Sequence, residues 1–253
     1  MTRTIIFIHG MFQNAKSWKD WESYFSKEGY ECIAESWPLH EGEPRDLRIK
    51  PPVRLGDLRL QTVIDRYVDL IQKKGVQPIV VGHSVGGLVV QKLAEHGLIQ
   101  AGVPIASVAP NRMLTFDWGF FRNSLQITNP VAGDEPFEMD ADGFHQNFAN
   151  TMDREKSDEA YERTATHDSR NVLRDCMLET GTMDLERVTA PLYFIGAAED
   201  QIIPSSLCEK NAKAYGNGMP YREFSGRGHF ICGQPGWEEV AGSVASWLKT
   251  LPI

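Results

Sequence analysis

The chain has 253 residues, of which 42% are hydrophobic and 24% are charged, so it can form one or two domains with a large core that needs no disulfide or metal support. At this length we expect one α/β domain with an insertion. The 26 basic and 34 acidic residues give a net charge of −8. This balance argues against nucleic acid or an anionic membrane as the main partner, because phosphate binding depends on clustered Lys and Arg.

The start of the chain and its cysteines favour a cytoplasmic protein. Residues 4–8 form an apolar run that is too short for the core of a signal peptide, and no apolar run approaches the ~18 residues of a membrane span. The four cysteines are scattered, without a C-x-x-C pair or a histidine at metal-ligand spacing: Cys32, Cys176, Cys208 and Cys232. We therefore expect a reduced protein with no metal site, in which the cysteines are core residues.

Short β-branched runs alternate with segments of helical period along the chain. Strands are predicted at 4–8, 31–35, 78–81, 103–108, 192–195 and 221–224, and helices at 16–27, 57–74, 85–96, 205–215 and 237–248. Asp57 is expected to cap its helix, Gly75 to end it, and the proline-rich segment 38–56 to form a loop. The alternation predicts a mostly parallel sheet with helices on both faces.

Residues 110–187 break this alternation. The segment lacks buried-strand runs, and it is rich in charge and aromatic residues. We therefore predict a helical insertion at 110–187 and a core made of residues 1–109 and 188–253. The aromatic residues that mark the insertion are Phe116, Trp118, Phe120, Phe121, Phe137, Phe144, Phe148 and Tyr161.

The strongest chemical signal is the sequence Gly82-His83-Ser84-Val85-Gly86. It follows the predicted strand at 78–81 and opens the helix at 85–96, which is the strand–turn–helix context that a G-x-S-x-G nucleophile requires. Small flanking residues let strand and helix approach closely, and the turn lifts the Ser84 hydroxyl above the carboxyl edge of the sheet. The sequence thus predicts Ser84 as a nucleophile.

A serine hydroxyl needs a general base, and that base needs a carboxylate that fixes its tautomer. His229 follows the predicted strand at 221–224, so it is expected at the same edge of the sheet. Glu199 and Asp200 both follow the strand at 192–195, and the residues alone do not separate these two acids. The order serine, acid, histidine is the order of the α/β-hydrolase fold.

Acyl transfer also needs two donors for the oxyanion of the tetrahedral intermediate. The backbone N–H of Val85, directly after the serine, is the first candidate. The second should come from the loop after the first strand, His9-Gly10-Met11-Phe12. We expect the Met11 N–H there, with Phe12 as the second choice.

Together these motifs resemble the α/β-hydrolase superfamily, of the esterase type with a His-Gly-x oxyanion loop. The resemblance covers nearly the whole chain, from His9-Gly10 through Gly82–Gly86 and the loop from Asp200 to Pro204 to Gly228-His229-Phe230. It implies that Asp200 is the acid and that the insertion is a cap. Such proteins usually carry an antiparallel hairpin before the His-Gly strand. Only three residues precede that strand here, so we expect about six strands with an exposed first edge.

The function expected from these residues is hydrolysis of a small to medium carboxylic ester or lactone through an acyl-enzyme on Ser84. The reaction needs no cofactor. Phe12, His83 and Met113 are expected to contact the small-molecule substrate. Two alternatives stay open: another reaction on the same triad (lactone opening, C–C bond hydrolysis, perhydrolysis or hydroxynitrile cleavage), and a non-catalytic ligand receptor. The oligomeric state cannot be read from the sequence.

Overall fold

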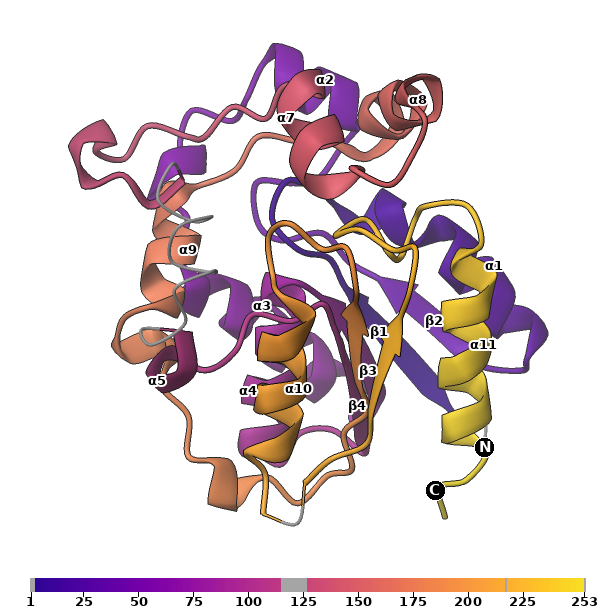
Figure 1. Ribbon diagram of the computed structural model, residues 1–253. Helices are drawn as coiled ribbons and strands as arrows, with labels where there is room; N and C mark the ends of the chain where they lie inside the picture. The colour runs from indigo at the N-terminus through magenta and orange to yellow at the C-terminus, as the bar shows by residue number, and fades with distance from the viewer. Residues whose placement is uncertain (1–2, 115–126, 217, 253) are drawn as a thin grey trace.

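A computed structural model describes residues 3–114, 127–216 and 218–252, which fold around one six-stranded parallel sheet (Figure 1). The strand order is β2-β1-β3-β4-β5-β6, and every pairing is parallel. This confirms the predicted fold class. The strands are β1 (Thr4–Ile8), β2 (Glu31–Ala34), β3 (Ile79–His83), β4 (Ala101–Ile105), β5 (Phe194–Ala197) and β6 (Tyr221–Phe224).

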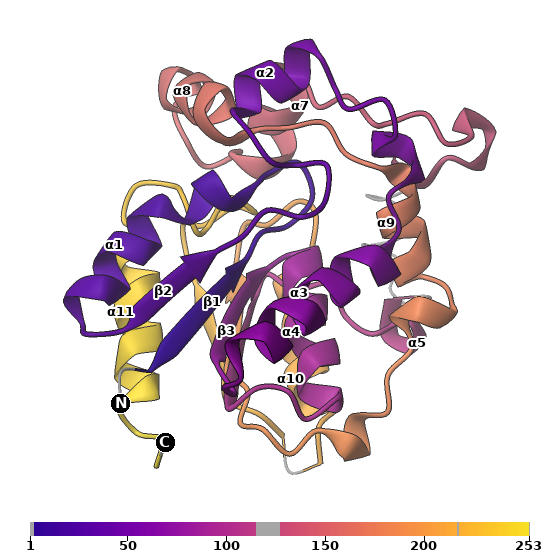
Figure 2. The same cartoon turned by 180° about the vertical axis from the view of Figure 1, so that it is seen from behind.

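One exposed edge of the sheet lies at β2, and β6 forms the other. β1 is fully buried between β2 and β3, whereas residues of β2 are exposed or half-buried (Figure 2). Charged and polar groups lie along the β2 edge: the Glu31 carboxylate accepts a hydrogen bond from Thr4 Oγ1 at 2.8 Å and pairs with Lys74 at the end of helix α3 (Leu60–Lys74). Charge on an edge strand discourages pairing with another chain.

Successive side chains of a strand point to opposite faces of the sheet, and a layer of helices covers each face. Ile5 and Phe7 of β1 pack with α1 (Lys19–Lys27) and α11 (Trp237–Leu248) in one core cluster. Ile6 and Ile8 pack in a second cluster on the opposite face. The helices of that second layer are α3 (Leu60–Lys74), α4 (Val85–Glu95) and α10 (Ser205–Lys213), as Figure 1 shows.

The start of α3 differs from the prediction. Asp57 does not cap this helix but ends a 3-10 turn (Leu55–Asp57) and bonds with Arg54, whereas α3 begins at Leu60. Asp175, far away in the sequence, supplies the capping carboxylate and accepts the Leu60 N–H at 3.1 Å. The predicted stop is correct, since Gly75 has φ of 67°.

Other boundaries shift for local reasons. The helix predicted at 16–27 begins as a 3-10 turn (Ala15–Trp18) capped by Asn14. The strand predicted at 103–108 lies earlier, at Ala101–Ile105, because Ala106 has φ of 43°, which is not an extended conformation and ends the strand. The segment 38–56 is not a plain loop, since Pro44 starts a short helix, α2 (Pro44–Ile49), where its missing N–H is not needed.

In its described part the segment 110–187 adds no strand to the sheet. Its helices are α5 (Asn111–Leu114), α7 (Ala141–Gly143), α8 (Arg154–Thr164) and α9 (Arg170–Cys176), with a π-helical turn at Phe144–Phe148 and 3-10 turns at Pro130–Ala132, Glu179–Gly181 and Leu185–Arg187. Phe116, Trp118, Phe120 and Phe121 lie outside the described residues. α7 and α8 lie over the carboxyl ends of the strands, together with α2 (Figures 1 and 2).

Arg48 of α2 connects the loop after β2 with helix α8 of the segment 110–187. Its guanidinium lies 4.3 Å from the centre of the Tyr161 ring, donates to the carbonyls of Tyr161 and Ala165, and pairs with Glu162. The loop after β2 thus lies together with helices of the segment 110–187 over the carboxyl ends of the strands.

Glycines let α4 lie directly against the strands. A Cβ on Gly86 would come within 2.4 Å of the Ile8 carbonyl oxygen, and a Cβ on Gly82 within 2.3 Å of the Gly86 carbonyl oxygen. Real Cβ atoms do not approach backbone so closely, so any larger residue here would push the helix away from the sheet.

Substitution of Gly86 by alanine should lower the free energy of unfolding by about 1–3 kcal/mol, because the added methyl group meets backbone that cannot yield. Gly242→Ala is the matched control, since the nearest atom to its new Cβ is the Tyr24 hydroxyl at 3.6 Å. That change should leave stability equal or raise it by about 0.5–1 kcal/mol. Urea unfolding of both variants measures the difference, and equal midpoints would contradict the packing argument.

Candidate active site

Ser84 lies in a sharp turn between β3 and α4. Its backbone has φ of 56° and ψ of −120°, a conformation that residues other than glycine rarely adopt. Hydrogen bonds from both sides hold the turn: the Ser84 N–H donates to the Ile105 carbonyl at 3.0 Å, and its own carbonyl accepts from Gly87 at 3.0 Å and Val108 at 3.1 Å. The turn directs the hydroxyl into a cavity at the carboxyl edge of the sheet.

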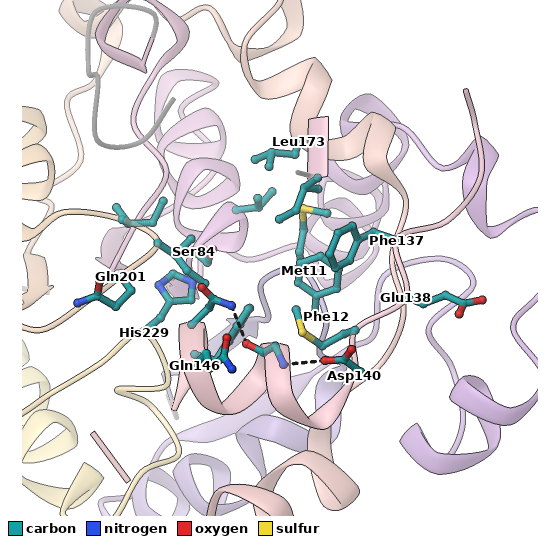
Figure 3. Close-up of a pocket in the computed structure, with 18 of the residues that line it drawn as sticks. Met11, Phe12, Ser84, Phe137, Glu138, Asp140, Gln146, Leu173, Gln201 and His229 are labelled. Carbon is teal, nitrogen blue, oxygen red and sulfur yellow. Dashed lines mark hydrogen bonds between the residues drawn. The ribbon is translucent and has the colours of Figure 1, made fainter. Parts of the chain in front are cut away.

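His229 and Asp200 form a buried pair at the same edge. His229 Nδ1 donates to Asp200 Oδ2 at 2.7 Å, and both side chains are excluded from solvent. The other oxygen, Oδ1, accepts the N–H groups of Ile202 at 2.7 Å and Ile203 at 2.9 Å, so the carboxylate is fixed in place. Among the described residues, His229 Nε2 has no hydrogen-bond partner, and both His229 and Ser84 line the cavity (Figure 3). Nε2 is therefore available to accept a proton.

The geometry separates the two acids that the sequence left open. Glu199 is exposed, and its carboxylate accepts the backbone N–H of Arg227 at 2.9 Å. It therefore holds the loop before His229 without contacting the imidazole. Asp200 is the acid that bonds with the ring.

The loop after β1 approaches the serine as expected. A Cβ on Gly10 would lie 2.7 Å from Ser84 Cβ, so only glycine allows the two turns to meet. Met11 and Val85 line the cavity beside Ser84. The N–H of Phe12, the second choice as oxyanion donor, is already bonded to Asp168 Oδ2 at 2.9 Å. This arrangement favours Met11 and Val85 as the two donors.

Two further histidines support the site from behind. His9 Nε2 accepts the Trp37 N–H at 3.0 Å while Nδ1 donates to the Gly10 carbonyl at 2.8 Å. His83 Nε2 donates to the His229 carbonyl at 2.8 Å. Burial is the main reason that the pKa of each imidazole is well below its usual range, and a neighbouring imidazole, His40 for His9 and His229 for His83, lowers it further. Both rings are therefore neutral near pH 7.

Two residues expected to contact the substrate, His83 and Met113, are not among the described residues that line the cavity. His83 does not line the described cavity, because its side chain points to the same face of β3 as Ile79 and Val81 and packs against the His229 ring. Met113 of α5 is half-buried against the core and is also absent from the described lining. Phe12, the third expected contact, does line the cavity.

The cavity has a volume of about 360 Å³, and both apolar and polar residues line it, including the acidic residues Glu138 and Asp142 (Figure 3). Phe12 packs against Phe137 and Phe148, with ring centres 5.4 and 5.9 Å away. Most of the cavity lining could not be predicted from the sequence, because the spacing of the aromatic residues does not distinguish a cavity from a core. The remaining apolar lining includes Met11, Val108, Ile127, Met139, Leu173, Ile202 and Ile203, and polar residues at the cavity include Asp140, Gln146, Asn147 and Gln201.

In the part of the chain that the structure describes, no three His, Cys, Asp or Glu side chains are grouped to hold a metal ion. No described helix combines the length and apolar character that crossing a bilayer requires.

The strand order, the serine turn after β3 and the histidine–carboxylate pair after β5 and β6 define an α/β-hydrolase fold. The chain belongs to the alpha/beta hydrolase family, which it matches over residues 5–242.

Solved structures agree on the fold. A monoacylglycerol lipase from Paleococcus ferrophilus has 20% identity and a TM-score of 0.69, with 98% of this chain and 95% of that chain covered. Polyneuridine aldehyde esterase has 13% identity and a TM-score of 0.71, with 98% and 99% covered. Tomato methylketone synthase I has 13% identity and a TM-score of 0.74, with 98% of both chains covered. A search among curated proteins finds no match.

The neutral buried histidines predict a loss of stability in acid. Because the pKa values of His9 and His83 are lowered on folding, the unfolded chain binds more protons than the folded chain below the ordinary histidine pKa of about 6.5. The free energy of unfolding should therefore fall with decreasing pH from there, by about 1.4 kcal/mol per pH unit for each imidazole.

His83→Gln isolates one of these contributions, because a glutamine amide can still donate to the His229 carbonyl without titrating. Urea unfolding between pH 5 and 6.5 should show a shallower pH dependence in the variant, by up to about 1.4 kcal/mol per pH unit. Parallel curves for both proteins would refute the assignment of a neutral His83.

Proposed function

We propose that the chain is a serine hydrolase that cleaves a small to medium carboxylic ester or lactone through an acyl-enzyme on Ser84. The observation that carries the proposal is the His229 imidazole. Nδ1 is bound to the buried Asp200 carboxylate at 2.7 Å, and Nε2 is unpaired among the described residues in the cavity that Ser84 lines. This is the arrangement that a general base for a serine hydroxyl requires.

The reaction has two steps. Ser84 Oγ attacks the ester carbonyl carbon while His229 Nε2 takes the hydroxyl proton, and the Met11 and Val85 N–H groups bind the oxyanion. The intermediate collapses, the C–O bond breaks, and His229 gives the proton to the leaving alcohol. Water then attacks the acyl-enzyme with His229 as base, which releases the acid and restores Ser84. Asp200 stays ionised and stabilises the imidazolium.

The cavity supports a substrate of limited size. Its volume of about 360 Å³ lies at the lower end of the range for small-molecule sites. Phe12, Phe137 and Phe148 give it an aromatic wall, which suits an apolar acyl or alcohol group. Because the fold hosts several chemistries, lactone opening, C–C bond hydrolysis, perhydrolysis and hydroxynitrile cleavage remain as alternatives. A receptor has no chemical need for a strained serine beside a free imidazole nitrogen.

The first test is the rate on p-nitrophenyl esters from acetate to palmitate, with wild type beside Ser84→Ala. We expect turnover with a maximum at short to medium acyl chains, and its loss in the variant, whose thermal midpoint should stay near that of the wild type. Turnover that persists in Ser84→Ala would refute the nucleophile assignment.

Labelling by a fluorophosphonate separates the alternatives. A labelled Ser84 without ester turnover would point to another reaction on the same residues, and lactones and cyanohydrins would be tested next. If Ser84 is not labelled and the protein does not hydrolyse any of the esters, the result would favour the non-catalytic receptor.

The role of Asp200 is tested against its neighbour. Asp200→Asn should lower kcat by about 10³- to 10⁴-fold, because an amide favours the wrong imidazole tautomer. Glu199→Gln is the matched control, since the amide oxygen can still accept the Arg227 N–H, and its kcat should stay within about threefold of wild type. A reversed order of the two effects in steady-state kinetics would move the acid to Glu199.

A further inference from the structure

The oxyanion loop, residues 9–14, is held by two other segments. The loop after β2 contacts it through the Trp37 N–H, which donates to His9, and through the His40 and Gly42 carbonyls, which accept from the Asn14 amide at 3.1 Å. Residues 166–168 of the insertion contact it from another direction, and the Thr166 N–H donates to the Phe12 carbonyl at 2.9 Å. The position of the proposed oxyanion donor therefore depends on residues far away in the sequence.

Asp168 is the centre of these contacts. Its side chain is fully buried, Oδ2 accepts the Phe12 N–H at 2.9 Å, and Oδ1 accepts the Ser169 N–H at 2.7 Å. Its backbone also pairs with Phe137, which is part of the cavity wall, through two hydrogen bonds of 2.8 and 3.1 Å. One residue of the insertion thus connects the oxyanion loop with the cavity wall.

His40 is the ionic partner of the buried Asp168 carboxylate and offsets the cost of burying its charge. Its Nε2 lies 3.3 Å from Asp168 Oδ2, Nδ1 donates to the Pro38 carbonyl at 3.1 Å, and the ring is buried. Burial is the largest single influence and lowers the pKa of His40, but the charge and hydrogen bonding of Asp168 together with the other raising influences, among them the Pro38 carbonyl, leave that pKa raised. Glu41 also raises the pKa of His40, while the His9 ring is the like-charged neighbour if both rings are protonated.

The backbone at Phe12 needs such an external restraint. Its φ of 63° is unfavourable for a bulky residue, and a conformation of this kind persists only where surrounding contacts hold it. Asp168 binds the N–H and residue 166 binds the carbonyl of this one residue, so the insertion holds Phe12 at both of its peptide groups. The Met11 N–H belongs to the preceding peptide group, and the same restraint on Phe12 limits its orientation.

We propose that Asp168, paired with His40, is a positioning residue for the oxyanion hole: it fixes the Met11–Phe12 peptide so that the Met11 N–H points at the oxyanion. The inference rests on the proposed function. It assigns to the insertion a part in stabilising the transition state, beyond covering the substrate. Asp168 contacts no reacting atom and acts only through the loop.

Asp168→Asn tests the proposal, because an amide cannot accept from both Phe12 and Ser169 and leaves His40 without its charge partner. Asp175→Asn is the matched control. Asp175 is a second buried carboxylate of the insertion that accepts a core N–H, that of Leu60, and it also pairs with Arg59. Both variants should lose stability, and only Asp168→Asn should alter the oxyanion hole.

Below the unfolding temperature, Asp168→Asn should lower kcat about 10- to 100-fold with KM within about threefold, the size expected for a misplaced rather than a deleted donor. The rate of Ser84 labelling by a fluorophosphonate and the affinity for a trifluoromethyl ketone, which forms a tetrahedral adduct, should fall in parallel. Asp175→Asn should keep all three within about threefold of wild type.

His40→Phe serves as a second variant in case Asp168→Asn does not fold, and its kcat should fall by at least about threefold at unchanged KM. Wild-type kcat in a folded variant, or a higher KM at unchanged kcat, overturns the proposal. If the wild type is labelled and Asp168→Asn is labelled equally fast, this inference alone fails. If the wild type is neither labelled nor active, the proposed function fails, and the inference with it.

Discussion

The backbone turn at Ser84 is the constraint on which the site depends. A serine at φ of 56° is unfavourable by about 1–3 kcal/mol, which contacts around the turn must offset. Compensation comes from Ile105 at the end of β4, which supplies an acceptor, from Val108 in the loop after β4, which supplies a donor, and from glycines that let α4 touch β1. The central strands are fully buried and close-packed, so the turn has no room to relax.

A parallel sheet then brings the other parts of the site to the serine. The carboxyl ends of all six strands lie at one edge, so the loops after β1, β3, β5 and β6 meet there. Each loop contributes one element: the Gly10–Met11 turn, Ser84, Asp200 and His229. Each is in turn fixed by backbone hydrogen bonds, as Ile202 and Ile203 fix the Asp200 carboxylate. The geometry is therefore a property of the sheet as well as of the four residues.

Local sequence was sufficient for the features that depend on neighbours in the chain. The apolar runs predicted the parallel sheet, the G-x-S-x-G pattern predicted the turn, and Gly75 predicted the end of α3. Predictions failed where a distant residue intervenes. Asp57 has the residue type of a helix cap, yet Asp175 from the insertion takes that place. His40 lies in a loop as predicted, but its pairing with Asp168 could not be predicted, because the two residues are 128 positions apart and nothing in either neighbourhood indicates the pair.

Four buried histidines around the site differ in their partners, and that difference separates their chemistry. His9 and His83 bond only with backbone groups and with no carboxylate, so burial keeps them neutral and rigid. His40 and His229 each face a buried carboxylate, which stabilises positive charge on the ring. The His40 Nδ1 atom donates to the Pro38 carbonyl, and its Nε2 lies 3.3 Å from the Asp168 carboxylate, away from the described cavity. His229 alone of these four combines a carboxylate partner with a nitrogen that is unpaired and faces the cavity, and this combination lets an imidazole exchange a proton with a bound substrate.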